Sequence, residues 1–298
     1  MDNLANIFNI SCWKTAILNH PVKGGLALLG FLTFSKHLCD CAQVLYRHFL
    51  RPARILQERY GNCWALITDT SDVVGATYAK ALSKRFNLLI LHEEGSSVDR
   101  EMVMKLTKLG SKVVTMPVIY HEGYGSKSLR KIQEFFSGRE IGLIIINQLN
   151  LIRDPRALKK SSPAEKNLFF QESIVFPVLL LRYLTPIMLR REKKSGIIAL
   201  SHQYISPSSF GLYEIIAKAF LDAFLRSLGA EYRGRLDAIH FEVGSVIGLK
   251  RVNPMPFFAL PPNVAVKGQL AAVGYEKKSS GHWKHYLEKY LTYKQFHK

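Results

Sequence analysis

The sequence predicts an α/β fold in which a doubly wound parallel sheet carries helices on both faces. From residue 63 onward, short apolar runs typical of buried strands alternate with segments of helical spacing. These helical segments are long enough to cross over from one parallel strand to the next. Hydrophobic residues make up 48% of the 298-residue chain, which is enough for the core of one large domain.

The elements follow one another in regular order. The expected strands are the apolar runs at 63–68, 88–91, 112–119, 141–146, 197–200 and 238–243. The expected helices are the segments at 73–86, 98–109, 128–136, 164–190 and 213–232. After residue 243 the alternation gives way to proline-containing sequence, a loop expected over the carboxyl edge of the sheet, where ligands bind in such folds. Residues 285–296 alternate aromatic and cationic residues, which fits a helix on a membrane surface or a packed terminal helix.

The first 60 residues differ in composition from the rest of the chain. An apolar run at 24–34 lies between Lys23 and Lys36, and it is too short to cross a bilayer squarely. With Trp13 before it and cations after it, the run indicates an interfacial or re-entrant membrane anchor, or else a helix packed on the domain. We therefore expect a membrane-associated helical segment at 1–60 and one α/β domain at 61–298.

Charge and cysteine content narrow the function classes. The chain has 41 Lys+Arg against 23 Asp+Glu, a net charge of +18 that is spread along its length. No nucleic-acid-binding motif accompanies the charge, so a solvated basic surface or an anionic membrane surface is favoured over nucleic acid. The four cysteines all lie within the first 63 residues, which favours a reduced, intracellular protein. His282 and His285 have no companion ligands nearby in the sequence, and no metal site is expected.

The loop after the first expected strand carries the clearest family signal. Residues 68–75 read Thr-Asp-Thr-Ser-Asp-Val-Val-Gly, which resembles the Thr-Gly-x-x-x-Gly-Ile-Gly turn of the short-chain dehydrogenase/reductase family. Residues 58–65 and the Ser-Gly-His-Trp at 280–283 resemble one branch, the very-long-chain 3-oxoacyl-CoA reductases and the hydroxysteroid dehydrogenase-like proteins, some of them inactive. The resemblance covers roughly residues 40–295 and implies a Rossmann-type fold and a nicotinamide cofactor.

The cofactor positions implied by this resemblance are partly lost. Asp69 and Val73 replace two glycines that let the backbone approach the pyrophosphate, and only Gly75 remains. Asp69 adds negative charge and Val73 adds bulk, so both oppose binding. The alternative is a helix N-terminus capped by Ser71 or Asp72 with no nucleotide. By resemblance, the cofactor-binding candidates are Thr68, Ser71, Asp72, Gly75, Glu93, Asn147 and Lys218.

Three further cofactor positions also differ from the family pattern. Glu93 stands after the second strand, where it would repel a 2′-phosphate and accept a hydrogen bond from a ribose hydroxyl. Pro117 stands where the resemblance implies an aspartate, and Leu149 replaces a glycine after Asn147, which could still brace the sheet edge. We therefore expect NAD(P), with NAD favoured over NADP by Glu93, or no cofactor at all.

The resemblance implies Ser201, Tyr213 and Lys218 as the catalytic group. Tyr213 lies five residues before Lys218, so it is rotated by about one residue's turn from the position four before, which Glu214 occupies. We expect Glu214 and Lys218 to form an ion pair on the helix surface. The resemblance also implies an asparagine on the preceding helix, and residues 171–173, which are Gln, Glu and Ser, contain none.

The sequence leaves two functions open. The favoured one is a divergent, catalytically impaired or inactive hydroxysteroid dehydrogenase-like protein that binds a lipid or a partner at a membrane. The alternative is an active NAD(P)H-dependent reductase of a steroid or a long-chain 3-oxoacyl ketone. The expected partners are a membrane surface or lipid, a lipophilic small molecule, and a protein partner or second copy of the chain. The expected location is the endoplasmic reticulum, with the mitochondrion as the alternative.

Overall fold

The computed structural model describes residues 21–96, 100–122, 126–150, 162–203, 212–249 and 256–296. The chain divides into two units, Met1–Arg51 and Pro52–Lys298. In the first unit the described residues form one long helix, α3 (Pro21–Leu45), which continues into a short π-helix, η1 (Tyr46–Leu50). Its large apolar side chains are mostly exposed, with Leu26, Leu29 and Leu32 each more than half accessible to solvent.

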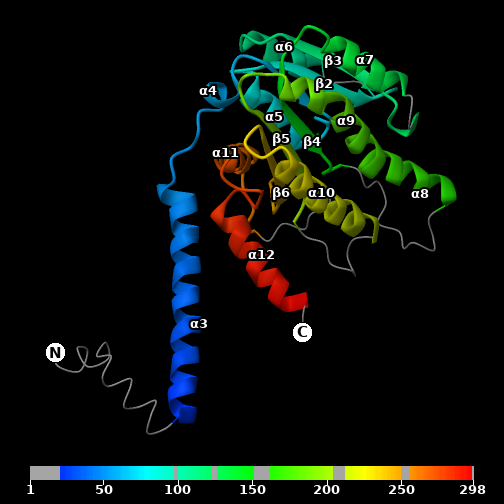
Figure 1. Cartoon of the computed structure of the whole chain (residues 1–298). Helices are drawn as coiled ribbons and strands as arrows, with labels where there is room; N and C mark the ends of the chain where they lie inside the picture. Colours follow the sequence, from blue (N-terminus) through cyan, green and yellow to red (C-terminus); the bar gives the residue numbers. More distant parts are fainter. Residues whose placement is uncertain are drawn as a thin grey trace. The chain divides into compact units, whose positions relative to one another are not determined.

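The second unit is built on a seven-stranded parallel sheet in the order β3-β2-β1-β4-β5-β6-β7 (Figure 1). Its strands are β1 (Trp64–Ile67), β2 (Asn87–Glu93), β3 (Val113–Val118), β4 (Ile141–Asn147), β5 (Ser195–His202), β6 (Leu236–Val243) and β7 (Lys278–Ser279). This order confirms the predicted doubly wound architecture, because the sequence runs outward from β1 in one direction and then from β4 in the other. Six strands lie where the apolar runs predicted them, whereas the two-residue β7 was not predicted.

Helices cover both faces of the sheet. They are α4 (Leu56–Tyr60), α5 (Val73–Leu82), α6 (Arg100–Lys108), η2 (Tyr120–Glu122), α7 (Lys127–Phe135), α8 (Pro163–Phe170), η3 (Gln171–Val175), α9 (Phe176–Leu189), α10 (Leu212–Glu231), α11 (Pro262–Ala272) and α12 (Trp283–Phe296). The helix expected at 164–190 is therefore α8, η3 and α9 in succession.

One helical stretch among the described residues, Pro163–Leu189, is long and apolar enough to cross a membrane. It lies in the middle of the chain and not in the N-terminal segment. Half of its most apolar window is buried within the protein. Leu180 and Leu184 on α9 pack into the core under the sheet, so this stretch has the properties of a core helix.

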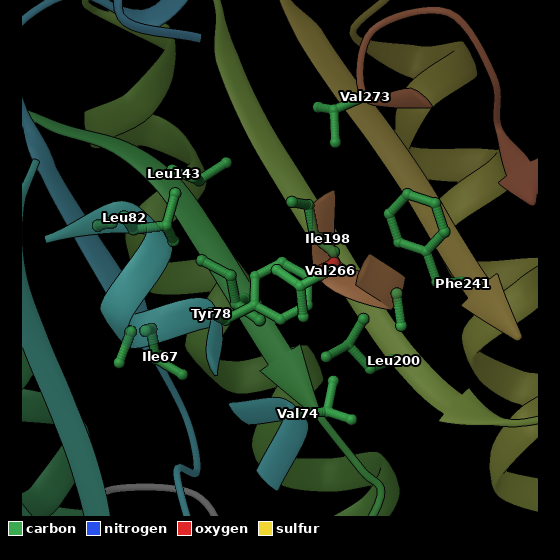
Figure 2. Close-up of a cluster of buried hydrophobic side chains, with 14 of the residues drawn as sticks. Ile67, Val74, Tyr78, Leu82, Leu143, Ile198, Leu200, Phe241, Val266 and Val273 are labelled. Carbon is green, nitrogen blue, oxygen red and sulfur yellow. The ribbon is translucent and has the colours of Figure 1, made fainter. Parts of the chain in front are cut away.

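Each face of the sheet has its own apolar core. On one face Tyr78 of α5 and Val266 of α11 pack against the strands (Figure 2). On the other face α7, α9 and α10 cover a second cluster. Residues of β5 alternate between the two clusters, with Ile198 on the first face and Ile197 on the second. Burial on both faces explains why the strands read as nearly continuous apolar runs.

The segment before β1 is fixed to the start of β6. Arg59 of α4 forms two hydrogen bonds to the carboxylate of Asp237, the longer at 2.8 Å, and the Tyr60 hydroxyl donates to the same carboxylate at 2.9 Å. These contacts give a structural reason for the Arg-Tyr pair that precedes the first strand. These contacts lie at the amino-terminal edge of the sheet, opposite the carboxyl edge where the candidate site lies.

Candidate functional site

The carboxyl edge of the sheet gathers the loop after β1 and the ends of β4, β5 and β6. Helix α5 begins at Val73, and its N-cap is Asp72. Asp72 is one of the two residues, with Ser71, that the sequence offered as caps. The Asp72 carboxylate accepts hydrogen bonds from the backbone N–H groups of Val74 and Gly75 at 2.8 and 3.0 Å. The next N–H group, that of Ala76, donates to the Asp72 carbonyl oxygen at 3.0 Å. The first turn of α5 thus has its N–H groups at 74–76 bonded within the protein.

Ser71 is held by Asp69 and does not cap the helix. The Asp69 carboxylate accepts from the backbone N–H of Ser71 at 2.9 Å and from its hydroxyl at 2.8 Å. The side-chain amide of Asn150 donates to the same hydroxyl at 2.6 Å. The Asp69 carboxylate therefore closes the loop as a compact turn through its bonds to Ser71.

Asn147 joins the end of β4 to this loop. Its backbone N–H donates to the Thr68 hydroxyl at 2.9 Å, and its side-chain amide donates to the Asp69 carbonyl oxygen at 3.1 Å and to the Asp72 carboxylate. The structure thus brings Thr68, Asp72 and Asn147 together. Burial raises the pKa of Asp72, and the bonds from Gly75 and Asn147 offset part of that shift.

Gly75 lies at a position where a side chain cannot fit without a shift of its neighbours. A Cβ atom there would lie 2.5 Å from the Asp69 carbonyl oxygen and 2.6 Å from the Asn147 amide nitrogen. Val73, at a former glycine position, points its side chain toward the loop after β6, where a Cβ on Gly248 would lie 3.3 Å from it. The branched side chain therefore lies between the two loops, at a position where the resemblance implies a glycine.

Glu93 lies at the end of β2, beyond Ile90, which pairs with Ile67 at the end of β1. Its carbonyl oxygen accepts hydrogen bonds from the hydroxyl and the N–H of Ser96. Pro117 lies within β3 and pairs with His92, so it is part of the strand and not of the loop after it. Glu93 thus lies at the end of β2, which is separated from β4 and Asn147 by β1.

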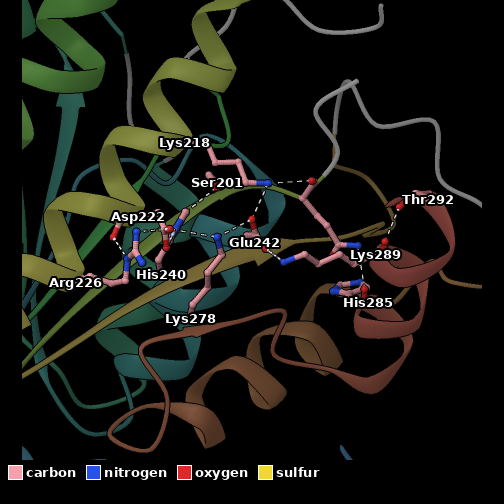
Figure 3. Close-up of polar contacts among 11 residues, drawn as sticks. Ser201, Lys218, Asp222, Arg226, His240, Glu242, Lys278, His285, Lys289 and Thr292 are labelled. Atoms are coloured by element: carbon pink, nitrogen blue, oxygen red, sulfur yellow. Dashed lines mark hydrogen bonds and ion pairs between the residues drawn. The ribbon is translucent and has the colours of Figure 1, made fainter. Parts of the chain in front are cut away.

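Lys218, the candidate catalytic lysine on α10, is bound to a carboxylate on β6. Its amine lies 2.8 Å from Oε1 of Glu242 and donates to the carbonyl oxygen of Gln203 at 3.1 Å (Figure 3). The Glu242 side chain is only 3% exposed, and it also contacts Lys278 at 3.3 Å and Lys289. The expected ion pair between Glu214 and Lys218 was wrong. Helix α10 packs on β6, so Lys218 reaches a buried strand carboxylate, while Glu214 is itself buried and not on the surface.

The electrostatics of this ion pair are dominated by burial and charge. Burial acts to raise the pKa of Glu242, but Lys218 and Lys289 outweigh it and hold the pKa at about 2. Burial lowers the pKa of Lys218, and the Glu242 carboxylate offsets part of that shift. Glu242 is therefore ionised at neutral pH and neutralises Lys218 inside the domain.

Tyr213, the candidate catalytic tyrosine, lies in an aromatic cluster. Its ring centroid is 5.2 Å from that of Phe169 and 6.0 Å from that of Phe170, both on α8. The buried hydroxyl has no hydrogen-bond partner in the part of the chain that the structure describes. The contacts of Tyr213 are thus with α8, whereas those of Lys218 are with β5 and β6.

Ser201, the third catalytic candidate, contacts a histidine that sequence reasoning missed. The Ser201 hydroxyl oxygen is 2.8 Å from Nε2 of His240, and Nδ1 of His240 is 3.6 Å from a carboxylate oxygen of Asp222 (Figure 3). Burial lowers the pKa of His240 to about 4, so the ring is neutral at pH 7. The signal available in the sequence was that His240 and Glu242 are polar residues in the apolar run at 238–243.

The end of β6 is covered by α12. Glu288 accepts hydrogen bonds from the N–H of Ser245 at 3.1 Å and from its hydroxyl at 2.5 Å. A Cβ on Gly244 would lie 2.5 Å from the Glu288 carboxylate and 2.7 Å from the His285 ring. Gly244 thus permits close approach of α12 to the strand end.

The residues present do not fit a bound dinucleotide well. Val73 and Asp69 place a branched side chain and a carboxylate in the loop where the resemblance implies pyrophosphate binding, and Lys218 is ion-paired with Glu242. A metal fits no better, since the described ranges contain no group of three or more His, Cys, Asp and Glu side chains that could hold one.

This sheet order, with a candidate serine on β5 and a lysine on α10, is the arrangement of the short-chain dehydrogenase/reductase fold. Comparison with solved structures supports that class. A 7β-hydroxysteroid dehydrogenase superposes with a TM-score of 0.67 at 14% identity, covering 81% of this chain and 94% of that one. A 3-oxoacyl-[acyl-carrier protein] reductase from Brucella melitensis in complex with NAD superposes with a TM-score of 0.53 at 18% identity, covering 62% and 74%. The domain therefore has the Rossmann-like fold that these solved structures share.

The curated relatives confirm the branch that the motifs indicated. This chain is 26% identical to a very-long-chain 3-oxoacyl-CoA reductase-like protein of Arabidopsis thaliana over 260 residues, 83% of this chain and 80% of that protein. It is 24% identical to the inactive hydroxysteroid dehydrogenase-like protein 1 of Rattus norvegicus over 293 residues, 94% of this chain and 82% of that protein. No protein-family model matches the chain. Its relatives thus include both proteins named reductases and proteins named inactive.

Proposed function

We propose that this protein keeps the short-chain dehydrogenase/reductase fold without its hydride-transfer activity, and that it acts at a membrane by binding a lipid or a partner. The observation that carries the proposal is the ion pair between Lys218 and Glu242. In the reaction implied by the resemblance, a lysine lowers the pKa of a neighbouring tyrosine so that the phenol can exchange a proton. A lysine neutralised by a buried glutamate has little charge to offer a phenol.

The other candidate groups support the same proposal. Tyr213 packs against Phe169 and Phe170, and the Ser201 hydroxyl is engaged with His240. Tyr213 thus contacts α8 and Ser201 contacts β6, whereas neither is in contact with Lys218 in these interactions. Several relatives carry names that include the word inactive, among them the human and rat hydroxysteroid dehydrogenase-like proteins.

Helix α3 supports the membrane part of the proposal. Its apolar residues are exposed along most of its length, including Leu26, Leu29 and Leu32. A helix that is apolar and exposed in water finds a favourable environment in lipid. The net charge of +18 favours an anionic membrane surface, and we place the protein at the endoplasmic reticulum, with the mitochondrion as the alternative.

The second candidate function is an active NAD(P)H-dependent reductase of a steroid or long-chain 3-oxoacyl ketone. It is favoured by the retained Ser201 and Lys218 and by the names of relatives such as the plant reductase-like protein. Activity would require Lys218 to leave Glu242 and Tyr213 to leave the aromatic cluster. Glu93 then favours NAD over NADP, because its carboxylate would repel a 2′-phosphate.

The test is a fluorescence titration of the purified full-length chain with NADH and, separately, NADPH. We expect no saturable binding, and no reduction of steroid ketones or 3-oxoacyl-CoA substrates. Saturable binding that is lost in Lys218→Met and kept in Lys131→Met, an exposed lysine on α7, would overturn the non-catalytic proposal. Ketone reduction by the wild-type chain would establish the second function instead.

A further inference from the structure

Helix α12 buries its polar face and exposes its apolar face. His285 and Glu288 are fully buried, and both contact Ser245, two residues after the end of β6. Lys289 reaches Glu242 from the same side of the helix (Figure 3). The polar side chains of α12 therefore hold the helix on the sheet, while large apolar side chains on its other face are exposed.

The outward face carries a stripe of two tyrosines and two leucines. Tyr286, Leu287, Tyr290 and Leu291 are 43%, 36%, 49% and 42% exposed. They form two pairs spaced four residues apart, so they lie side by side along one face of the helix. A helix on a water-exposed surface normally has the opposite arrangement, with its polar face outward. An exposed apolar stripe of this kind marks an interaction surface.

The stripe continues beyond the helix. Phe257, in the segment before α11, is 63% exposed and lies against the start of α12. The amine of Lys284 donates to the Phe257 carbonyl oxygen at 3.0 Å and lies 4.9 Å from the centroid of the Phe257 ring. It also lies 5.9 Å from the centroid of the Trp283 ring. Aromatic rings and a cation thus meet at the end of the stripe.

We propose that this surface, formed by Tyr286, Leu287, Tyr290 and Leu291 with Phe257 at its rim, binds the interfacial layer of an anionic lipid bilayer. Tyrosine and tryptophan favour the boundary between lipid headgroups and acyl chains, because their rings are apolar and their tips are polar. Lys284 places a cation beside the rings, and the chain's net charge of +18 is complementary to anionic headgroups. The contact rests on the membrane function proposed above and assigns a lipid-binding surface to the α/β unit itself.

Trp283 provides a direct probe of this surface. The full-length chain with Trp13→Phe would be mixed with phosphatidylcholine/phosphatidylserine vesicles whose acyl chains carry bromine, which quenches tryptophan fluorescence on contact. Emission that is lost in an added Trp283→Phe substitution belongs to Trp283. We expect this emission to be quenched by the brominated vesicles, and to be unaffected when bromine is absent. Trp64 is partly buried and packs against Phe135, and its emission, which remains after Trp283→Phe, supplies the background.

Variants distinguish vesicle binding by this surface from binding by α3 and from nonspecific binding by other exposed apolar residues. We expect Leu287→Ser with Leu291→Ser to weaken vesicle binding about tenfold or more, because two apolar side chains no longer enter lipid. The matched control, Met104→Ser with Leu109→Ser, alters two exposed apolar residues elsewhere and should leave binding unchanged.

The possible outcomes distinguish the two proposals. If the chain binds vesicles through α3, so that Leu28→Ser with Leu29→Ser abolishes binding, but Trp283 stays unquenched, the α12 surface is refuted while the membrane function stands. If the chain binds no vesicles, the membrane function fails as well. If the Leu287/Leu291 variant instead converts a dimer to a monomer and leaves vesicle binding intact, the surface binds a second copy of the chain and the lipid proposal is overturned.

Discussion

Replacing Glu242 with glutamine tests how the candidate site is held together. Glu242 on β6 contacts Lys218, Lys278 and Lys289, and its side chain is 3% exposed. Glutamine keeps the size of the side chain and removes its charge. The three ammonium groups would then repel one another at a buried position, where Lys218 already loses hydration.

The size of the effect follows from the pKa of Glu242. The pKa falls from its ordinary value of 4.5 to about 2 in the folded protein. Because each unit corresponds to about 1.4 kcal/mol, the ionised carboxylate stabilises the fold by about 3 kcal/mol, to order of magnitude, at neutral pH. Since the folded-state pKa is depressed, this stability is present above pH 4.5 and is lost as the pH falls from 4.5 toward 2. We expect E242Q to lower the midpoint of thermal unfolding by about 6–12 °C at pH 7.

The assay is urea unfolding followed by far-UV circular dichroism, on wild type and E242Q from pH 7 down to pH 3. The difference in unfolding free energy should be constant above pH 5 and should narrow below pH 4.5. The control is Glu101→Gln, which breaks an exposed ion pair with Lys105 and should cost only a few tenths of a kcal/mol. A loss below about 1 kcal/mol in E242Q, or a loss that does not change with pH, would refute the reasoning.

Three further predictions concern the same edge of the sheet. Asp72→Ala should lower the unfolding free energy by about 1–2 kcal/mol, because it removes the cap of α5, and urea unfolding measures this. Gly75→Ala should cost about 1–3 kcal/mol by the same assay, since its Cβ would meet the Asp69 carbonyl oxygen, whereas Gly25→Ala, which meets nothing within 4 Å, should not destabilise. Burial raises the pKa of Glu288 to about 7, so folding of the wild type should lose stability as the pH rises from 4.5 to 7 on this account. Glu288→Gln should remove this loss of stability between pH 4.5 and 7, as measured by urea unfolding. Equal pH dependence of the unfolding free energy in both proteins would contradict the prediction.

The strands and helices were predictable because the buried strands carry uninterrupted apolar sequence. The strand at 141–146 reads as one apolar run, and β4 is buried along its whole length. β7 escaped prediction because Lys278–Ser279 has no apolar residue and forms a strand only by pairing with β6. The central strands were therefore predictable from the local sequence pattern, whereas the edge strand β7 forms only through its pairing with β6.

The candidate site was only partly predictable, for a similar reason. The cap of α5 and the bracing by Asn147 follow from residue type and position in the loop. The partner of Lys218 does not, because Glu242 comes from the next strand and reaches the lysine only through the packing of α10 on β6. Helical spacing suggested Glu214, four residues before Lys218, as the ion-pair partner of the lysine. The partner in the folded protein is Glu242, which is buried on β6. The contact of Ser201 with His240 likewise depends on the pairing of β5 with β6.

The two ends of the sheet restrict how copies of this domain can associate. β3 forms one edge and contains Pro117, which has no N–H group to donate to a neighbouring strand. β7 forms the other edge and is only two residues long. Both features are ones by which proteins discourage strand addition and aggregation. A complex that includes this domain should therefore form through its helices, and a continuous sheet shared between chains is disfavoured.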